Sequence, residues 1–180
     1  TRIASRKTPA PEATLFIGDS MMEQYAPLID NLITQHPHDT YTAIFATQGL
    51  CPPIPSMLLH GRPECQRWME AVRILMHQDH IRRFVVSAHW TYYLRGADAR
   101  EKAQSLEFFL RELARIRPTT LVLSAPVGRE FDPSTMFEGS RFSHIRYTEH
   151  IRTAPLAHVL AWQELSRELL MSIAARAGVS

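Results

Sequence analysis

Short apolar runs alternate with segments of helical periodicity along this chain. The runs are rich in β-branched and aromatic residues and predict buried strands at residues 15–17, 41–46, 83–88 and 119–124. Apolar residues that recur every three or four positions predict helices at residues 21–35, 68–76, 100–116 and from about 153 to 177. Gly178 stands where a helix commonly ends on a capping glycine.

The alternation of strands and helices predicts crossover connections, and therefore a parallel sheet with helices on both faces. We expect a three-layer α/β/α sandwich formed by residues 14–180. Residues 1–13 are polar, include Pro9 and Pro11, and are predicted to be a linker. Ligands of such sheets bind outside the carboxyl ends of the strands, so the loops 18–21, 46–66 and 88–99 are the expected location of a site.

Composition narrows the possible functions. The chain has 180 residues, of which 45% are hydrophobic, which suits one domain with a hydrophobic core. Its formal charge of +2 gives no reason to expect a nucleic-acid partner. There is neither a glycine-rich phosphate-binding fingerprint nor a C-x-x-C pair, so we predict no nucleotide cofactor and no metal.

The tripeptide Gly18-Asp19-Ser20 follows the first predicted strand and precedes a helix. A serine at this point is a candidate nucleophile, because a tight turn exposes its hydroxyl and backbone N–H groups lie nearby to stabilise an oxyanion. Gly18 would permit the sharp turn. The alternative is that Asp19 or Ser20 simply caps the helix, since both residue types are favoured there. The tripeptide alone leaves both interpretations open.

Three further segments accompany this motif. They are the loop QGLCPPIPSMLLHGRPEC, the strand and its sequel FVVSAHWTYYL, and TTLVLSAPVGREFDPS. Together with Gly-Asp-Ser they resemble the SGNH (GDSL-like) hydrolase superfamily, over residues 14–178. The likeness is strongest to the SGNH domain fused to acyltransferase-3 membrane proteins, which O-acetylate bacterial surface polysaccharides. The resemblance implies an SGNH/flavodoxin-like fold and serine-dependent acyl transfer to a glycan, or ester hydrolysis.

The resemblance also implies roles for single residues. Ser20 would be the nucleophile, and its own N–H and that of Gly49 would stabilise the oxyanion. Gly49 is alternatively a turn glycine. His89 stands where the superfamily has an asparagine, and it would donate to the oxyanion or contact the acyl donor. The alternative is a strand-end histidine whose hydrogen bonds go to the backbone.

Substrate binding is assigned to Asp19, Trp90 and Tyr93. With Tyr92, the last two would form an aromatic platform for a sugar ring. The alternative is that at least one of these aromatic residues caps the core.

The superfamily takes its catalytic base from a D-x-x-H motif, and this sequence has none. His77 and His80 precede the third predicted strand and so lie at the wrong end of the sheet. His144, His150 and His158 follow the fourth. We therefore expect either a fragment that lacks its last strand and C-terminal motif, with a vacant sheet edge beside the fourth strand, or a pseudo-enzyme. A non-catalytic glycan-binding or docking module of the same fold is the alternative function.

Cys51 and Cys65 share one proline-rich loop, and they are either disulfide-bonded or both reduced. Taken with the resemblance, a disulfide implies an oxidising compartment such as the bacterial periplasm. The resemblance further implies a membrane acyltransferase domain in the same parent polypeptide, which would tether this domain to the membrane. The expected partners are an acyl donor and a glycan acceptor.

Overall fold

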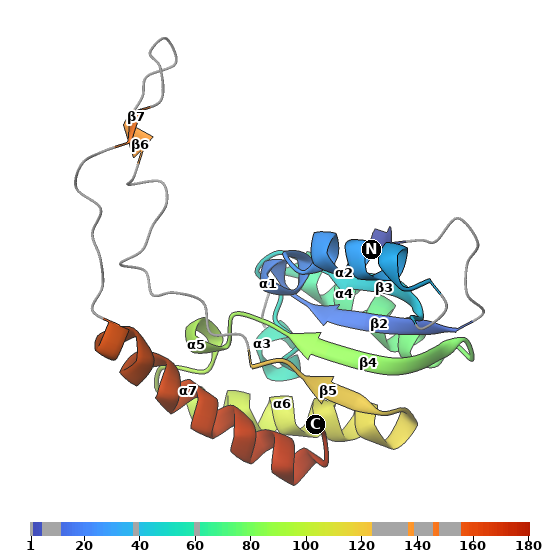
Figure 1. Cartoon of the computed structure of the whole chain (residues 1–180). Coiled ribbons are helices and arrows are strands. Elements are labelled where there is room, and N and C mark those ends of the chain that lie inside the picture. The colour runs from blue at the N-terminus through green and yellow to red at the C-terminus, as the bar shows by residue number, and fades with distance from the viewer. Residues whose placement is uncertain are drawn as a thin grey trace.

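A computed structural model describes residues 2–4, 12–37, 40–59, 62–123, 137–138, 146–147 and 156–180. Its main sheet has five strands in the order β1-β3-β2-β4-β5 (Figure 1). These strands are β1 (Arg2–Ala4), β2 (Ala13–Gly18), β3 (Thr42–Thr47), β4 (Ile81–Ser87) and β5 (Thr119–Leu121). The four strands β2 to β5 are parallel, as predicted. A separate antiparallel pair is formed by β6 (Phe137–Glu138) and β7 (Arg146–Tyr147).

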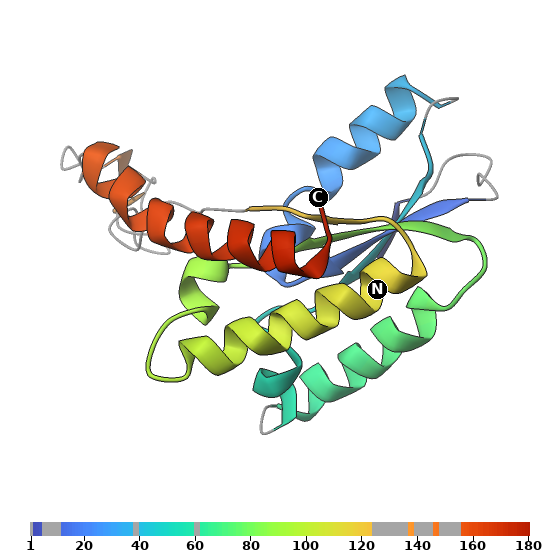
Figure 2. The same cartoon turned by 90° about the horizontal axis from the view of Figure 1, so that it is seen from below.

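Helices cover both faces of the main sheet, which confirms the predicted three-layer α/β/α architecture. The helices are α1 (Ser20–Glu23), α2 (Ala26–Gln35), α3 (Pro55–Leu59), α4 (Pro63–Met76), α5 (Trp90–Tyr93), α6 (Ala99–Ile116) and α7 (Leu156–Ala177). Helix α2 lies on one face, α4 and α6 lie on the other, and α7 packs beside α6 (Figure 2).

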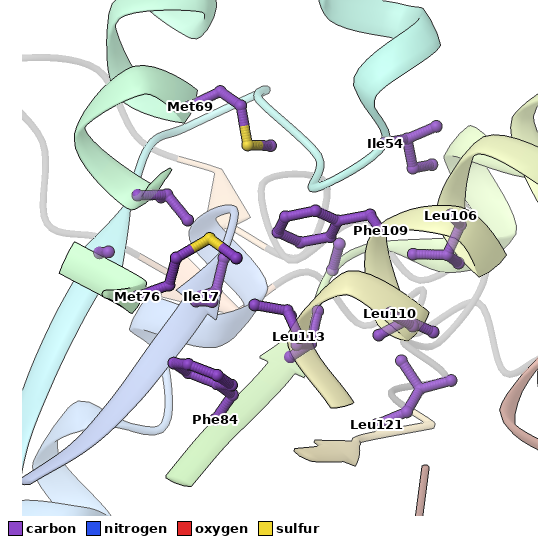
Figure 3. Close-up of a cluster of buried hydrophobic side chains, with 14 of the residues drawn as sticks. Ile17, Ile54, Met69, Met76, Phe84, Leu106, Phe109, Leu110, Leu113 and Leu121 are labelled. Carbon is purple, nitrogen blue, oxygen red and sulfur yellow. The ribbon is translucent and has the colours of Figure 1, made fainter. Parts of the chain in front are cut away.

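The main core fills the space between the sheet and the layer of α4 and α6. Ile17 and Phe84 from the sheet meet Met76 of α4 and Phe109 and Leu113 of α6 (Figure 3). All five side chains are at most 1% exposed. Burial of a large apolar side chain stabilises a fold by about 1.5–3 kcal/mol, so this cluster gives β2 and β4 a firm position. A smaller cluster, which includes Met22 and Phe45, lies under α1 and α2.

One predicted helix and one predicted loop need correction. The predicted helix 21–35 is interrupted at Gln24 and Tyr25, so α1 and α2 are separate. The cause is Pro27, which has no N–H for a helical hydrogen bond but fits the first turn of the new helix α2. The segment 46–66, which was predicted to be a loop, contains α3 and the beginning of α4.

The N-terminal segment also differs from expectation. Residues 2–4 were predicted to be part of a linker, but they form β1 and pair antiparallel with β3. Arg2 is level with Phe45, and Ala4 with Ala43. The chain therefore runs along β3 in the direction opposite to the four parallel strands.

The other end of the sheet is the edge of β5. The last helix ends as predicted, because Gly178 adopts a φ of 72° and Val179 N–H donates to the carbonyl of Ala174 at 3.1 Å. The chain then turns along β5, where Ser180 N–H donates to Thr119 and Leu121 N–H donates to Ser180. Among the described residues, no further strand of the main sheet follows β5.

Candidate functional site

Three loop segments meet at the carboxyl edge of the parallel strands. They follow β2, β3 and β4, and β2 lies between the other two strands. Gln48 N–H, after β3, donates to the carbonyl of Gly18 at 3.1 Å. From β2 the chain crosses to β3 on one side, and β4 lies on the other side. This reversal of strand order is where doubly wound sheets bind their ligands.

Gly18 allows β2 and β4 to approach closely at this edge. A Cβ atom at this position would lie 1.9 Å from the carbonyl oxygen of Ser87 and 2.7 Å from the Cβ of Met22. Its φ is not in the left-handed region. The physical reason for glycine is therefore the lack of space, and not the sharp turn that the sequence suggested.

Asp19, not Ser20, caps the helix. The Asp19 carboxylate accepts a hydrogen bond from Met21 N–H at 2.8 Å, while Ser20 is the first residue of α1. Asp19 is 1% exposed, whereas Ser20 is an exposed residue. Asp19 therefore serves as the helix cap, and Ser20, which is exposed, is left free for a reactant to approach.

The Asp19 carboxylate joins two of the three loop segments. Its Oδ1 accepts from Met21 N–H in α1, and its Oδ2 accepts from His89 N–H after β4 at 3.1 Å. Burial raises the pKa of Tyr93 far above its ordinary value, and the negative charge of Asp19 raises it further. No residue pattern indicated that Asp19 and Tyr93 influence each other, since the two residues are far apart along the chain and tyrosine is a common core residue.

Gly49 lies in a turn that begins immediately after β3. Cys51 N–H donates to the carbonyl of Gln48 at 3.1 Å, with Gly49 and Leu50 at the two central positions. Leu50 has a φ of 61°, whereas the φ of Gly49 is not left-handed and no atom lies within 4 Å of where its Cβ would be. The turn therefore does not require glycine at position 49. The space around its Cβ position is open.

His89 is the N-cap residue that precedes α5, and its backbone N–H is bonded to the site. Besides the hydrogen bond to Asp19, its ring Nδ1 lies 3.2 Å from the Oγ1 of Thr91. The ring meets Tyr92 edge-on at 5.8 Å between centroids, and the residue is half-buried. The N–H of His89 is therefore used in a structural hydrogen bond to Asp19. Its half-buried ring is not part of that bond.

The three residues assigned to substrate binding are all buried. Trp90 is 0% and Tyr93 is 4% exposed, and the Trp90 indole N–H donates to the carbonyl of Val122 at 2.9 Å. The Asp19 carboxylate is enclosed by donors of the protein itself. We therefore assign Asp19, Trp90 and Tyr93 to the framework of the site and not to its substrate-binding surface. For the two aromatic residues, this agrees with the alternative that an aromatic residue caps the core.

Two of the candidate histidines, His77 and His80, lie away from this edge. His80 accepts through its carbonyl from Ala13 N–H, at the beginning of β2, and His77 ends α4. Both therefore lie at the amino end of the sheet, as predicted. His144 and His150 fall outside the described residues, and His158 lies in α7. Within the described ranges no cluster of three metal-ligating side chains occurs.

Cys51 and Cys65 form a disulfide, with their Cα atoms 5.3 Å apart. Both are buried. Cys51 closes the turn that contains Gly49, and Cys65 lies in the first turn of α4. The nearby indole N–H of Trp68 in α4 donates to the carbonyl of Ala46 at 3.1 Å. The turn is thus fixed to a helix of the main core.

Comparisons with known proteins place this geometry in a family. No curated protein and no solved structure matches the chain. None of the described helices has the length and apolar character needed to cross a bilayer. Residues 2–180 match the family described as the SGNH domain fused to AT3 domains. The match covers nearly the whole chain, so the chain belongs to the SGNH domains that are fused to AT3 domains.

Proposed function

We propose that this domain performs serine-dependent acyl transfer through Ser20, with a glycan hydroxyl as the acceptor, or ester hydrolysis when water takes that place. The observation that carries the proposal is the exposed Ser20 hydroxyl at the carboxyl end of β2, beside a buried aspartate that takes over the capping role. Membership of the SGNH family supports the same chemistry.

In the proposed reaction, the Oγ of Ser20 attacks the carbonyl carbon of an acyl donor. The tetrahedral intermediate then expels the donor's alcohol, and the acyl group stays on Ser20. The acceptor hydroxyl attacks this ester in turn and releases Ser20 with its proton restored. The N–H groups of Ser20 and Gly49 would stabilise the negative oxygen of each intermediate, and the His89 ring would donate a further hydrogen bond.

The sequence has no D-x-x-H motif, and a serine hydroxyl is a weak nucleophile without a base. We therefore expect acylation by this chain to be slow, with the acceleration that an oxyanion hole alone provides. The same absence favours a second candidate function, a non-catalytic module of SGNH fold that binds a glycan or docks on its membrane partner.

The proposed setting follows from the family and from the disulfide. The description of the family pairs this domain with AT3 domains, so the acyl donor would come from a membrane acyltransferase in the same polypeptide. A buried disulfide persists in oxidising compartments. We therefore propose that the domain works in the bacterial periplasm, tethered to the membrane through its parent protein.

Labelling with a fluorophosphonate probe tests the proposal. We expect mass spectrometry to find the probe on Ser20, and Ser20→Ala to abolish labelling without loss of stability, because Ser20 is exposed and Asp19 supplies the cap. Ser172→Ala, at an exposed serine of α7, is the matched control and retains the label. If the folded wild-type protein stays unlabelled, or if Ser20→Ala is labelled equally, the enzymatic proposal fails and the non-catalytic module is favoured.

A further inference from the structure

We propose that a cleft under α2, at the end of the sheet remote from Ser20, binds an aliphatic carboxylate. The hydrocarbon chain of the ligand lies in the cleft, and its carboxylate pairs with the guanidinium of Arg83. This site is separate from the proposed acyl-transfer site and does not depend on it.

The first observation is the cleft itself. Its volume of about 410 Å³ falls within the range of roughly 300–1,000 Å³ that is typical of small-molecule sites. Phe16 of β2 and Ala43 of β3 line it from the sheet, and Ile29, Leu32 and Ile33 line it from α2. The C-terminal half of α2 stands away from the strands (Figure 2), and Leu32 is 43% exposed. An apolar chain that enters this cleft leaves water for an apolar surface, which is favourable.

The second observation is where the cleft lies. Thr14, near the beginning of β2, and Arg83, near the beginning of β4, are register partners, and both line the cleft. Tyr41, which also lines it, immediately precedes β3. These residues belong to the amino end of the parallel strands, whereas Ser20 follows the carboxyl end of β2. A ligand in the cleft therefore leaves the Ser20 edge open.

The third observation is the charge at the cleft. Arg83 is exposed, and its guanidinium carbon lies 5.9 Å from the centroid of the Tyr41 ring, a distance at which the ring attracts and orients the cation. Among the residues that the structure describes, no carboxylate forms an ion pair with Arg83. The adjacent Arg82 differs, because it binds the carboxylate of Glu12 at 2.9 Å. The cleft thus has a positive charge that is available to a ligand.

These features together select the ligand class. A guanidinium matches a carboxylate with two parallel hydrogen bonds, so a neutral lipid would leave the strongest polar group of the cleft unused. A sugar requires many hydrogen-bonding partners, but most of the lining residues are apolar, and the hydroxyl of Thr40 already donates to the carbonyl of His36. An apolar chain with one carboxylate at its end satisfies both the walls and the cation.

Titration of the ¹⁵N-labelled protein with decanoate, followed by NMR, tests the proposal. We expect saturable shifts of the amides of Thr14, Ile33 and Tyr41, and none at Ser20. Decanol has the same chain without the charge, and we expect it to bind the same amides roughly fivefold more weakly, as loss of an exposed ion pair predicts. Acetate, which has the charge without the chain, is expected to give no saturable shift.

Two neighbouring arginines provide the matched variants. Arg83→Met removes the charge and retains an apolar side chain, so we expect it to weaken decanoate binding roughly fivefold and to leave decanol binding unchanged. Arg82→Met makes the same change at the next residue, which is also exposed, and is expected to leave decanoate binding unchanged.

Each outcome has a definite meaning. Shifts confined to the cleft, with a loss that is specific to decanoate and to Arg83→Met, support the proposal. It is overturned if decanoate gives no saturable shift at the cleft, if decanol binds as tightly as decanoate, or if the two arginine variants lose binding equally. Fluorophosphonate labelling of Ser20 is a separate readout, so failure of the acyl-transfer proposal leaves this test unaffected.

Discussion

Replacement of Gly18 by alanine is the most severe single change that the structure predicts. The new Cβ would lie 1.9 Å from the Ser87 carbonyl oxygen, more than an ångström short of the 3.0 Å below which real Cβ contacts essentially do not occur. The obstacle is backbone, so no side-chain rotation relieves it. The carboxyl ends of the central strands β2 and β4 must separate, although Gly18 and Ser87 are register partners there.

The cost follows from two contributions. Overpacking at a site that cannot rotate away costs about 3 kcal/mol. Loss of a hydrogen bond where the strands part costs about 1 kcal/mol more. We therefore expect Gly18→Ala to reduce the free energy of unfolding by ~4 kcal/mol, which is a large share of the stability of a domain of this size.

Urea unfolding followed by circular dichroism measures this effect. Gly49→Ala is the matched control, because no atom lies within 4 Å of its Cβ position and its φ is not left-handed. We expect that variant to unfold within about 0.5 kcal/mol of the wild type. If Gly18→Ala were equally stable, the close approach of β2 and β4 would be incorrect, and with it the placement of Ser20 beside the β4 segment.

Two further predictions concern stability. Cys51 and Cys65 are separated by 14 positions, and reduction of their disulfide is expected to lower the free energy of unfolding by about 3 kcal/mol. A Cys51→Ala/Cys65→Ala variant is expected to be insensitive to reductant. An equal effect of reductant on both proteins would contradict a stabilising role for the disulfide. The raised pKa of Tyr93 means that the folded state holds this proton more tightly than the unfolded chain, so stability is expected to fall as pH rises above the ordinary tyrosine value of 10.0. Urea unfolding at about pH 8 and about pH 11 checks this, and a slope as steep in Tyr93→Phe as in the wild type would assign it to other groups.

The periodicity of the sequence predicted the parallel sheet and its covering helices, because burial on both faces of a strand and on one face of a helix leaves a pattern in the residues themselves. It missed β1, since three residues that gain hydrogen bonds only by pairing with β3 leave no such pattern. It also missed the break before α2, although Pro27 was the local signal for it.

The site was predictable where local chemistry decides and unpredictable where contacts are long-range. The Gly-Asp-Ser motif indicated a residue at a strand-to-helix turn, and the structure divides the motif into a residue fitted to a tight space, a cap and an exposed hydroxyl. The hydrogen bond from His89 N–H to Asp19 depends on the adjacency of β2 and β4, which no residue pattern encodes. Trp90 and Tyr93 were therefore assigned to a ligand surface when their surroundings are the interior.

The direction of β1 determines where a preceding stretch of polypeptide would emerge. From Ala4 to Arg2 the backbone heads toward the rim that bears Ser20, because β1 opposes β3. A neighbouring domain joined there by a short connection would thus lie at the same rim as Ser20, and not at the opposite end of the sheet. Under the proposed function, such a domain would face the same rim to which an acyl group has to be delivered.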